Sequence, residues 1–197
     1  MLPNRLLFLI KNFKVKFSFF VLFFIVFTAI IAPIISPYNP IQIQKGKQFL
    51  PPSLTNYFGT DEFGRDVFSR TLYAGQISLL AGIVAVGFSA LVGVPLGLIS
   101  GYYGKIVDTL IMRTMDSLLA FPALLLALAI VAVLGPSSVN AMIAVSIVSI
   151  PNFARISRAT ILTQKEKDYV EAAHSIGANN ARIIFLTIFP NCVGPIL

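Results

Sequence analysis

Three long stretches of this 197-residue chain carry no charged side chain, and their length restricts the fold more than any other feature. They cover residues 17–35, 71–104 and 117–154. A helix of about 20 apolar residues crosses the hydrocarbon core of a bilayer. The composition agrees: 56% of the residues are hydrophobic and 12% are charged, against roughly 45–50% and about 25% in soluble domains. We therefore predict an all-α membrane protein, a polytopic bundle of transmembrane helices.

The first two uncharged stretches each predict one span. A cleavable signal peptide is the alternative for residues 17–35. The apolar region of such a peptide has only about 7–15 residues and ends in an A-x-A-like site, and neither condition is met here. We therefore expect a retained anchor. Residues 71–104 are enough for one tilted span with its ends, and Pro95 inside that span predicts a kink.

The third stretch is interrupted at residues 135–138, which read Gly-Pro-Ser-Ser. This break predicts two spans, at about 116–134 and 139–154, with Pro122 and Pro151 near span boundaries. A short charged turn is expected just before them, formed by Lys105, Asp108, Arg113 and Asp116. Four spans are therefore expected in this chain.

Basic residues collect on one side of the expected membrane. They lie in the N-terminal tail, which includes Arg5 and Lys11, in the 105–113 turn, and in the region 155–182. Cytoplasmic loops carry such an excess of lysine and arginine, so we expect the N-terminus and these segments in the cytoplasm. The basic residues left outside are Lys45, Lys47, Arg65 and Arg70. The same rule accounts for the net charge of +7, so membrane lipid is an expected partner and nucleic acid is not.

The segment between the first two spans, residues 36–70, is expected on the extracytoplasmic side. Apolar residues near its end recur at almost helical spacing: Phe63, Val67 and Leu72. Two opposite-charge pairs lie three and four residues apart: Glu62 with Arg65, and Asp66 with Arg70. These patterns predict an amphipathic helix that leads into the second span. The acidic residues of this stretch lack the 1-3-5 alternation of a calcium loop, so no metal site is expected.

Small residues recur at every fourth position along the second span. They are Ala81, Ala85, Ser89, Gly93, Gly97 and Gly101. Such a stripe lets helix backbones approach closely, and each four-residue step advances it by about 40° around the helix. Packing within the chain explains the stripe, and a seam with another subunit is the alternative for part of it.

A polar segment, residues 167–190, follows the last predicted span. Its good helix formers predict a helix over residues 168–176, and Gly177 stands where a helix end needs a positive φ. Asp168 and Glu171 lie at the helix start, where the macrodipole favours negative charge. Ala172 and Ala173 would leave a flat face for a groove on another protein. An ordinary surface helix with a glycine cap is the alternative.

The chain has one histidine and one cysteine. His174 lies inside the polar segment and is expected to be an exposed surface side chain, because no partner is spaced to share a metal ion with it. Cys192 excludes an internal disulfide and a metal site built from cysteines.

Two motifs together resemble a known family. Glu171-Ala172-Ala173, followed by Gly177 and Pro190, resembles the cytoplasmic Glu-Ala-Ala loop of the membrane subunits of ATP-binding-cassette (ABC) importers. The usual Ile-x-Leu-Pro ending reads Thr-Ile-Phe-Pro at 187–190, which keeps the register. A second string resembles the segment before the second span in the peptide and nickel branch. Its matching positions are Gly59, Thr60, Asp61, Gly64, Arg65 and Asp66.

The resemblance implies a type I importer permease fold and a C-type permease subunit for dipeptides, oligopeptides or nickel. Such a subunit forms half a pore in the bacterial plasma (inner) membrane. Its implied partners are a homologous second permease, two cytoplasmic ATPase subunits and an extracytoplasmic substrate-binding protein. The residues that would couple it to the ATPase are Asp168, Tyr169, Glu171, Ala172, Ala173, Gly177 and Pro190. The second-permease seam is then the alternative reading of the small-residue stripe.

The resemblance also implies how the chain is organised. Residues 1–70 would hold the tail, the first span and the extracytoplasmic segment, and residues 71–197 would form the type-1 transmembrane domain, with the coupling loop at about 155–190. Relatives usually carry two further spans, so the chain resembles a C-terminally truncated member. No cofactor is expected. No enzyme activity is expected either, because Gly104-Lys105 lacks the preceding glycine of a phosphate-binding loop.

Two other classes of protein predict features that this sequence lacks. A secondary transporter or channel would carry ionisable residues within its spans, and the three uncharged stretches contain none. A membrane enzyme would need a nucleophile paired with a base, and the only histidine and cysteine lie outside the spans. The importer subunit is therefore preferred, with peptide or chelated nickel left open as substrate.

Overall fold

The computed structural model of the chain describes residues 13–196, so the tail that carries Arg5 and Lys11 lies outside the described residues. The described part is helical, and its only β pairing is an isolated bridge between Thr60 and Asp66. The prediction of an all-α chain is confirmed. The backbone contacts divide the chain into two compact units, Met1–Ala81 and Gly82–Leu197, and each is described by itself.

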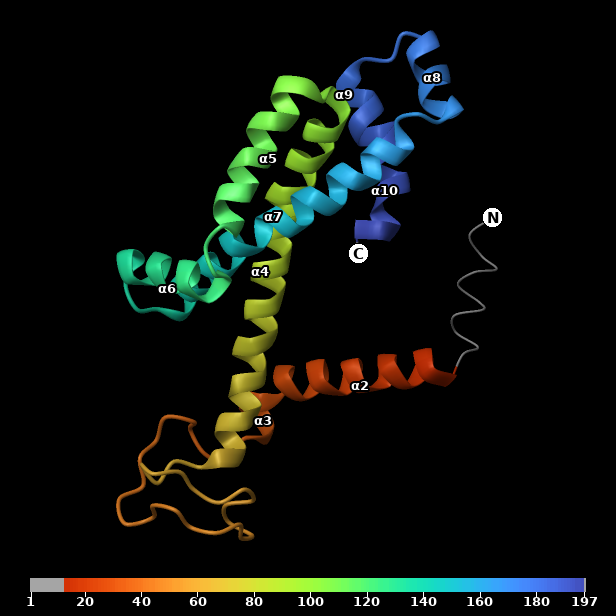
Figure 1. The fold of residues 1–197 in the computed structure, drawn as a ribbon. Coiled ribbons are helices and arrows are strands. Elements are labelled where there is room, and N and C mark those ends of the chain that lie inside the picture. Colours follow the sequence, from red (N-terminus) through yellow and green to blue (C-terminus); the bar gives the residue numbers. More distant parts are fainter. Residues whose placement is uncertain (1–12, 197) are drawn as a thin grey trace. The chain divides into compact units, whose positions relative to one another are not determined.

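The described part of the first unit opens with α2 (Phe13–Ile30) and the short α3 (Ala32–Ile35) (Figure 1). The chain is thus already helical at Phe13, four residues before the expected start of the first span, and the helix is interrupted at Ile31. Pro33 explains the interruption, since a proline has no N–H to donate to the carbonyl four residues before it. That carbonyl belongs to Ala29, and the side-chain amide of Gln76 donates to it at 2.8 Å. The freed backbone acceptor is therefore satisfied from another helix.

The amphipathic helix expected near the end of the extracytoplasmic segment is absent. Residues 59–66 form turns, and α4 begins only at Val67. Gly59 and Gly64 adopt positive φ angles of 71° and 73°, which a right-handed helix does not allow. The helical spacing of the apolar residues was therefore misleading, because the two glycines set the backbone of this stretch.

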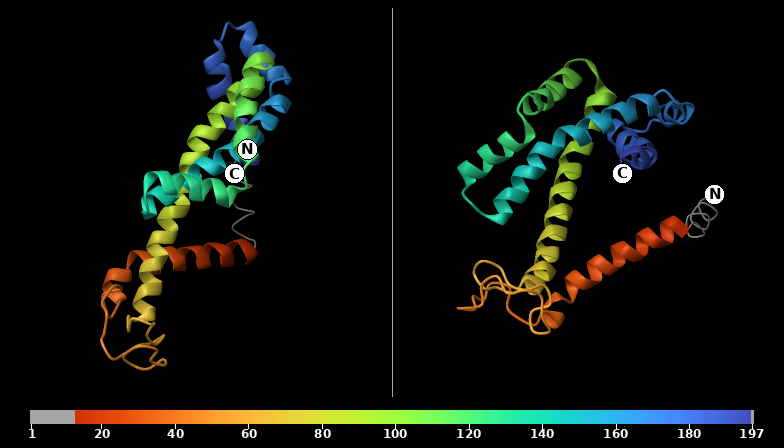
Figure 2. Two further views of the ribbon diagram at one scale, coloured as in Figure 1. Left: turned by 60° about the vertical axis from the view of Figure 1, so that its left-hand side comes forward. Right: turned by 60° about the horizontal axis from the view of Figure 1, so that its bottom comes forward.

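The helix α4 (Val67–Tyr103) belongs to the second unit from Gly82 onward. Seven further elements of this unit follow α4 among the described residues. They are α5 (Lys105–Leu119), α6 (Ala123–Leu134), α7 (Ser138–Gln164), α8 (Asp168–Ser175), α9 (Asn180–Arg182), the π-helix η1 (Ile183–Ile188) and α10 (Phe189–Ile196). Both α5 and α6 lie along α7 (Figure 2). α4 continues as one helix through Pro95.

Three boundary predictions in this unit were wrong. The charged stretch 105–116 is the helix α5, which follows a Gly104 at φ 64°. The span expected at 116–134 is broken after Leu119, and α6 is bent from α5 by 89°. Pro122 accounts for this break, because the residue before a proline is disfavoured in the helical region.

The last expected span also extends further than predicted. α7 runs to Gln164, ten residues past the expected end at Ala154, and Pro151 lies inside it. The arginines beyond Ala154 mark the end of the uncharged stretch but not of the helix, since Arg155 and Arg158 pair with carboxylates of α5. Among the described residues, three helices are long and apolar enough to cross a membrane, or four if α5 and α6 count as one broken span.

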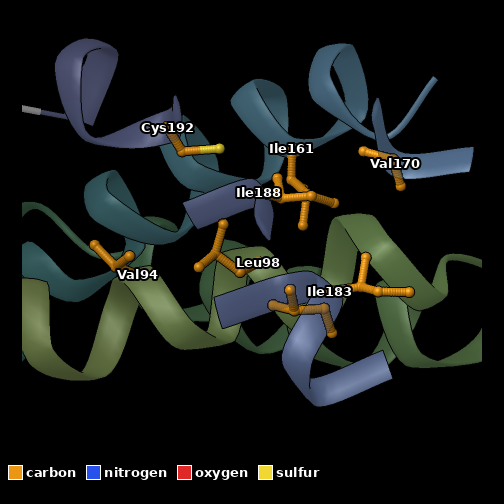
Figure 3. Packing of buried hydrophobic residues seen from close by; sticks show 8 residues of the cluster. Val94, Leu98, Ile161, Val170, Ile183, Ile188 and Cys192 are labelled. Atoms are coloured by element: carbon orange, nitrogen blue, oxygen red, sulfur yellow. The ribbon is translucent and has the colours of Figure 1, made fainter. Parts of the chain in front are cut away.

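The main hydrophobic cluster of the second unit lies where α4, α7, α8, η1 and α10 meet (Figure 3). Its fully buried members include Leu98 from α4 and Ile161 from α7. Val170 of α8 and Cys192 of α10 complete it from the other side. The cluster therefore joins the polar segment that follows α7 to two of the long helices.

Candidate functional site

The helix α8 has one buried and one exposed face. Val170 is 2% exposed, and Ala173, one turn later, packs partly buried against the hydrophobic cluster. The opposite stripe is exposed and consists of Asp168, Glu171, Ala172 and Ser175. We expected Ala172 and Ala173 to share one flat docking face. In the structure they lie on different faces, because adjacent helical residues point about 100° apart: Ala172 is exposed, and Ala173 is partly buried against the cluster.

A left-handed turn at Gly177 ends α8, as the sequence predicts. The φ of Gly177 is 79°. The N–H of Gly177 donates to the carbonyl of His174 at 2.9 Å, and the N–H of Ala178 donates to the carbonyl of Ala173 at 3.1 Å. These two bonds define the Schellman motif. Ile176, just before the glycine, is 83% exposed, so the turn presents an apolar side chain at its tip.

After the turn a new helix begins at a side-chain cap, and its backbone then widens into a π-helix. Asn179 Oδ1 accepts a hydrogen bond from the N–H of Arg182 at 2.8 Å, which caps α9. The next residues form η1, and single-turn π-helices of this kind are frequent at functional sites. Pro190, the last residue of the family spacing, is the second residue of α10 and is exposed. The next residue, Asn191, donates through Nδ2 to the carbonyl of Thr187 at 3.1 Å.

Tyr102 connects the end of α4 to both sides of the Gly177 turn. Its hydroxyl donates to Asn180 Oδ1 at 3.0 Å and lies 3.3 Å from His174 Nε2. The rings of Tyr102 and His174 are stacked with an interplanar angle of 17°. His174 is exposed as expected, but it is not isolated. Sequence reasoning missed Tyr102, because an aromatic residue at the end of a span has no distinguishing pattern.

A partly buried polar cluster joins the helices α4, α5 and α7. Arg158 of α7 donates to both carboxylate oxygens of Asp108 in α5, each at 2.5 Å. Ser100 of α4 donates to the same carboxylate at 2.5 Å. A second ion pair, Arg155 with Asp116, is more exposed. We had placed both aspartates in a turn, so the sequence suggested no partner for them.

The small-residue stripe of α4 lies against α7 over most of its length. A Cβ on Gly93 would stand 2.6 Å from the carbonyl oxygen of Ile150. A Cβ on Gly97 would overlap the carbonyl oxygen of Ala154, and a Cβ on Gly101 would overlap Ile161 Cγ2 and stand 3.0 Å from the carbonyl oxygen of Arg158. The hydroxyl of Ser89 donates to the carbonyl of Ser146 at 2.7 Å. This arrangement is packing within the chain.

The first two stripe positions differ from the rest. Ala85 is buried, while Ala81 is only partly covered and ends the first unit. No glycine stands at either position, so neither marks a place where backbones must touch. A seam with a second subunit stays a prediction for this end of the stripe.

The motif at residues 59–66 forms a tight turn around Asp61. One carboxylate oxygen accepts from the backbone N–H groups of Phe63 and Arg65 at 2.9 and 3.0 Å. The other accepts from Arg65 Nε at 2.8 Å and pairs with Arg70. Partial burial acts to raise the pKa of Asp61, but these hydrogen bonds outweigh it and lower the pKa to about 2. The predicted contact of Arg65 with Glu62 exists at 3.9 Å.

We predicted that Asp66 pairs with Arg70. In the structure Asp66 instead caps the helix α4. Its carboxylate accepts from the N–H and the hydroxyl of Ser69, both at 2.7 Å. This is the N-cap geometry, three residues ahead in the helix. The other oxygen accepts from Asn56 Nδ2 at 2.9 Å. An aspartate directly before a helix was the available signal, and the assumed longer helix hid it.

The remaining motif residues hold the turn closed. Thr60 donates through its hydroxyl to the carbonyl of Lys47 and accepts from the N–H of Leu50 at 2.9 Å. A Cβ on Gly59 or Gly64 would overlap a backbone carbonyl oxygen of Leu50 or Gln44. The residue types at these motif positions therefore have the same structural reason, which is that each helps to close the turn at residues 59–66.

These features define a class of protein: a multi-pass membrane protein with an amphipathic, glycine-ended helix attached to its spans. Residues 93–197 match a family described as the binding-protein-dependent transport system inner membrane component. Residues 9–52 match the N-terminal transmembrane domain of oligopeptide transport permease C. The chain belongs to this permease family, as the Glu-Ala-Ala segment indicated, and the family is one of transport permeases and not of enzymes.

Named relatives are similar over most of the chain. The dipeptide transport system permease protein DppC of Alkalihalophilus pseudofirmus is 49% identical over 74% of this chain and 48% of its own length. DppC of Haemophilus influenzae is 41% identical over 83% of this chain and 57% of its own length. The probable D,D-dipeptide permease DdpC of Escherichia coli is 42% identical over 83% and 55%. The chain spans about half the length of the curated relatives it matches.

Proposed function

We propose that this chain forms half of the translocation pathway of an ABC importer that carries peptides across the bacterial plasma (inner) membrane. The family supports the transport role, and the relatives named for dipeptides favour peptide over nickel as the substrate. In this proposal a homologous second permease completes the pathway. A substrate-binding protein delivers the peptide from outside, and ATP is hydrolysed on separate cytoplasmic subunits.

The exposed stripe of α8 carries the proposal. A helix of eight residues is too short to be stable by itself, and it is held in place by Val170 in the hydrophobic cluster. Its outer face is left free and bears Asp168, Glu171 and the small Ala172. Such a face fits a groove with basic residues at its rim on an ATPase subunit, because charge complementarity favours correct docking.

A substitution at Ala172 tests the docking directly. Ala172→Arg would place a long cation on the acidic stripe without touching the hydrophobic cluster, so we expect it to abolish peptide uptake and ATPase co-purification. The matched control is Ala159→Arg, an exposed alanine of α7 away from the stripe. Both variants are introduced at the chromosomal locus and checked for membrane insertion. Normal uptake by Ala172→Arg with the ATPase still attached would rule out this docking face.

The orientation of the chain is part of the proposal. The distribution of lysine and arginine supports a cytoplasmic N-terminus and a cytoplasmic α8. Single cysteines at Lys45, Ser137 and His174, each in a Cys192→Ala background, are treated with a membrane-impermeant thiol reagent in intact cells. We expect labelling at Lys45 and Ser137 and protection at His174. The opposite pattern would invert the arrangement and remove α8 from the ATPase.

Substrate choice is tested by competition. Cells that express the chain take up a labelled dipeptide, and unlabelled peptides or chelated nickel are added in excess. We expect peptides to compete and nickel to have no effect. Uptake of labelled nickel that peptides do not reduce would place the chain with the nickel importers of the same branch.

A further inference from the structure

Tyr102 occupies an unusual position relative to the Gly177 turn. Its single hydroxyl reaches His174 in α8 and Asn180 at the start of α9, so it contacts the chain on both sides of the glycine. The ring itself packs partly buried against the hydrophobic cluster. The hydroxyl is thus held by a fixed part of α4, and the two groups that it contacts belong to the segment that faces the cytoplasm in the proposed orientation.

The turn is packed on one side of the glycine and open on the other: Ala178 contacts the hydrophobic cluster, whereas the two residues before it do not. A Cβ on Gly177 would meet no atom within 4 Å, and Ile176 and Gly177 are both exposed. On α8 the buried contacts end at Ala173, one residue before His174. A glycine in an open turn is the place where a short helix pivots most easily. The contacts of Tyr102 oppose such a pivot because they lie directly across the turn.

We propose that the Tyr102 hydroxyl is a positioning group that ties the α8–α9 turn to the end of α4. This inference rests on the proposed function, in which an ATPase moves α8. With the tie in place, a displacement of α8 is passed to α4 as a movement of one rigid body. Without it, part of the displacement is absorbed by rotation at Gly177, and ATP is hydrolysed with less transport.

The path beyond Tyr102 is stiff. Gly101, the preceding residue, is buried against Ile161 and Arg158 of α7, and its carbonyl accepts a hydrogen bond from Lys165 Nζ at 3.0 Å. A movement of Tyr102 therefore cannot be absorbed between α4 and α7. Gly177 is the residue of this path at which the backbone rotates most easily. The Tyr102 hydroxyl contacts residues on both sides of it.

The test removes one oxygen atom. Tyr102→Phe keeps the ring and its packing but loses both contacts of the hydroxyl. The control is Tyr103→Phe on the adjacent residue, which is 49% exposed and whose hydroxyl has no hydrogen-bond partner among the described residues. The importer complex is reconstituted in lipid vesicles, and the ATP hydrolysed per labelled dipeptide imported is measured. We expect Tyr102→Phe to raise this ratio about two- to tenfold, the effect of one lost hydrogen bond, and Tyr103→Phe to leave it unchanged.

A second measurement tests the tie without any transport. Amide hydrogen exchange of residues 174–180 is followed in the purified membrane protein, and we expect it to be about two- to tenfold faster in Tyr102→Phe than in Tyr103→Phe. Asn180→Leu should have the same effect as Tyr102→Phe and add little to it, whereas Asn180→Asp, which keeps an acceptor, should exchange like the wild type. Equal exchange in Tyr102→Phe and Tyr103→Phe would overturn the tie. A wild-type complex that imports no peptide would refute the proposed function, and the exchange result would still decide the tie.

Discussion

Replacing Gly97 by alanine should weaken the contact between α4 and α7. The added Cβ would overlap the carbonyl oxygen of Ala154 and would stand 2.8 Å from Ser157 Cβ and 2.9 Å from Ala154 C. Carbon atoms in contact normally lie about 3.5–4.0 Å apart. The obstructing atoms are backbone and Cβ atoms, which no rotamer change can move. The helices must therefore separate by about 1 Å at this point.

The expected cost follows from that separation. A gap of about 0.5–1 Å forfeits a quarter to a half of each van der Waals contact across it, and overpacking generally costs about 1–3 kcal/mol. Alanine is favoured over glycine in a helix by about 1 kcal/mol, which offsets part of this loss. We expect a net loss of up to about 2 kcal/mol for Gly97→Ala. At about 2–4 °C per kcal/mol for a chain of this size, the unfolding temperature falls by up to about 8 °C.

The chain provides both a control and a reporter for this measurement. Gly87 lies on the same helix, and a Cβ there meets no atom within 4 Å, so Gly87→Ala should raise the unfolding temperature slightly. Cys192 is the only cysteine and is fully buried in the cluster shared by α4 and α7. Its reaction with a fluorogenic thiol dye on heating in detergent reports unfolding. If Gly97→Ala unfolds at or above the temperature of Gly87→Ala, the close crossing is wrong.

Three further predictions concern single interactions. Asp108→Asn breaks the half-buried pair with Arg158 and should lower the free energy of unfolding by about 1–3 kcal/mol in the same dye assay. Reversing both charges should restore part of that loss. An unchanged stability of Asp108→Asn would contradict the pairing. Because hydrogen bonds lower the pKa of Asp61 to about 2 from its ordinary 3.8, its contribution to stability is complete above pH 3.8 and is lost as the pH falls through about 2. Pepsin should therefore cleave segment 36–66 much faster at pH 2 than at pH 4, and an equal rate in wild type and Asp61→Asn across this range would contradict it. Gly59→Ala, which adds an overlap with a carbonyl to a positive φ, should open the same segment to trypsin at neutral pH more than Gly46→Ala, which has the positive φ alone.

Local signals predicted the backbone of the polar segment 167–190 well near its start. The helix at 168–175 and the left-handed Gly177 were both predictable, because a run of helix formers and a glycine at its end act over a few neighbouring residues. The burial of Ala173 was not, since it depends on Leu98 and Ile161, which come from distant helices. The same limit applies to Tyr102, whose partners lie more than 70 residues away along the chain.

The predictions of helix position failed where charged residues were taken as helix ends or where apolar spacing was taken as a helix. Asp108 and Asp116 were assigned to a turn because charged residues between uncharged stretches usually lie outside the membrane. In the structure each is neutralised by an arginine of α7, so the helix α5 continues past both. In the segment 36–70, the spacing of Phe63 and Val67 indicated a helix, but an apolar period cannot override the positive φ of Gly64.

Three consecutive residues near the end of α4 each contact a different part of the second unit. Ser100 donates to Asp108 in α5, Gly101 accepts from Lys165 after α7, and Tyr102 reaches the α8–α9 turn. Successive helical residues point about 100° apart, so less than one turn of helix is enough to face three neighbours. All three residues lie within the helix α4. A rotation of the last turn of α4 would therefore strain all three contacts together. The last turn of α4 is therefore where movement of α8 would be divided between α5 and α7, and its three contacts can be removed one at a time to measure each share.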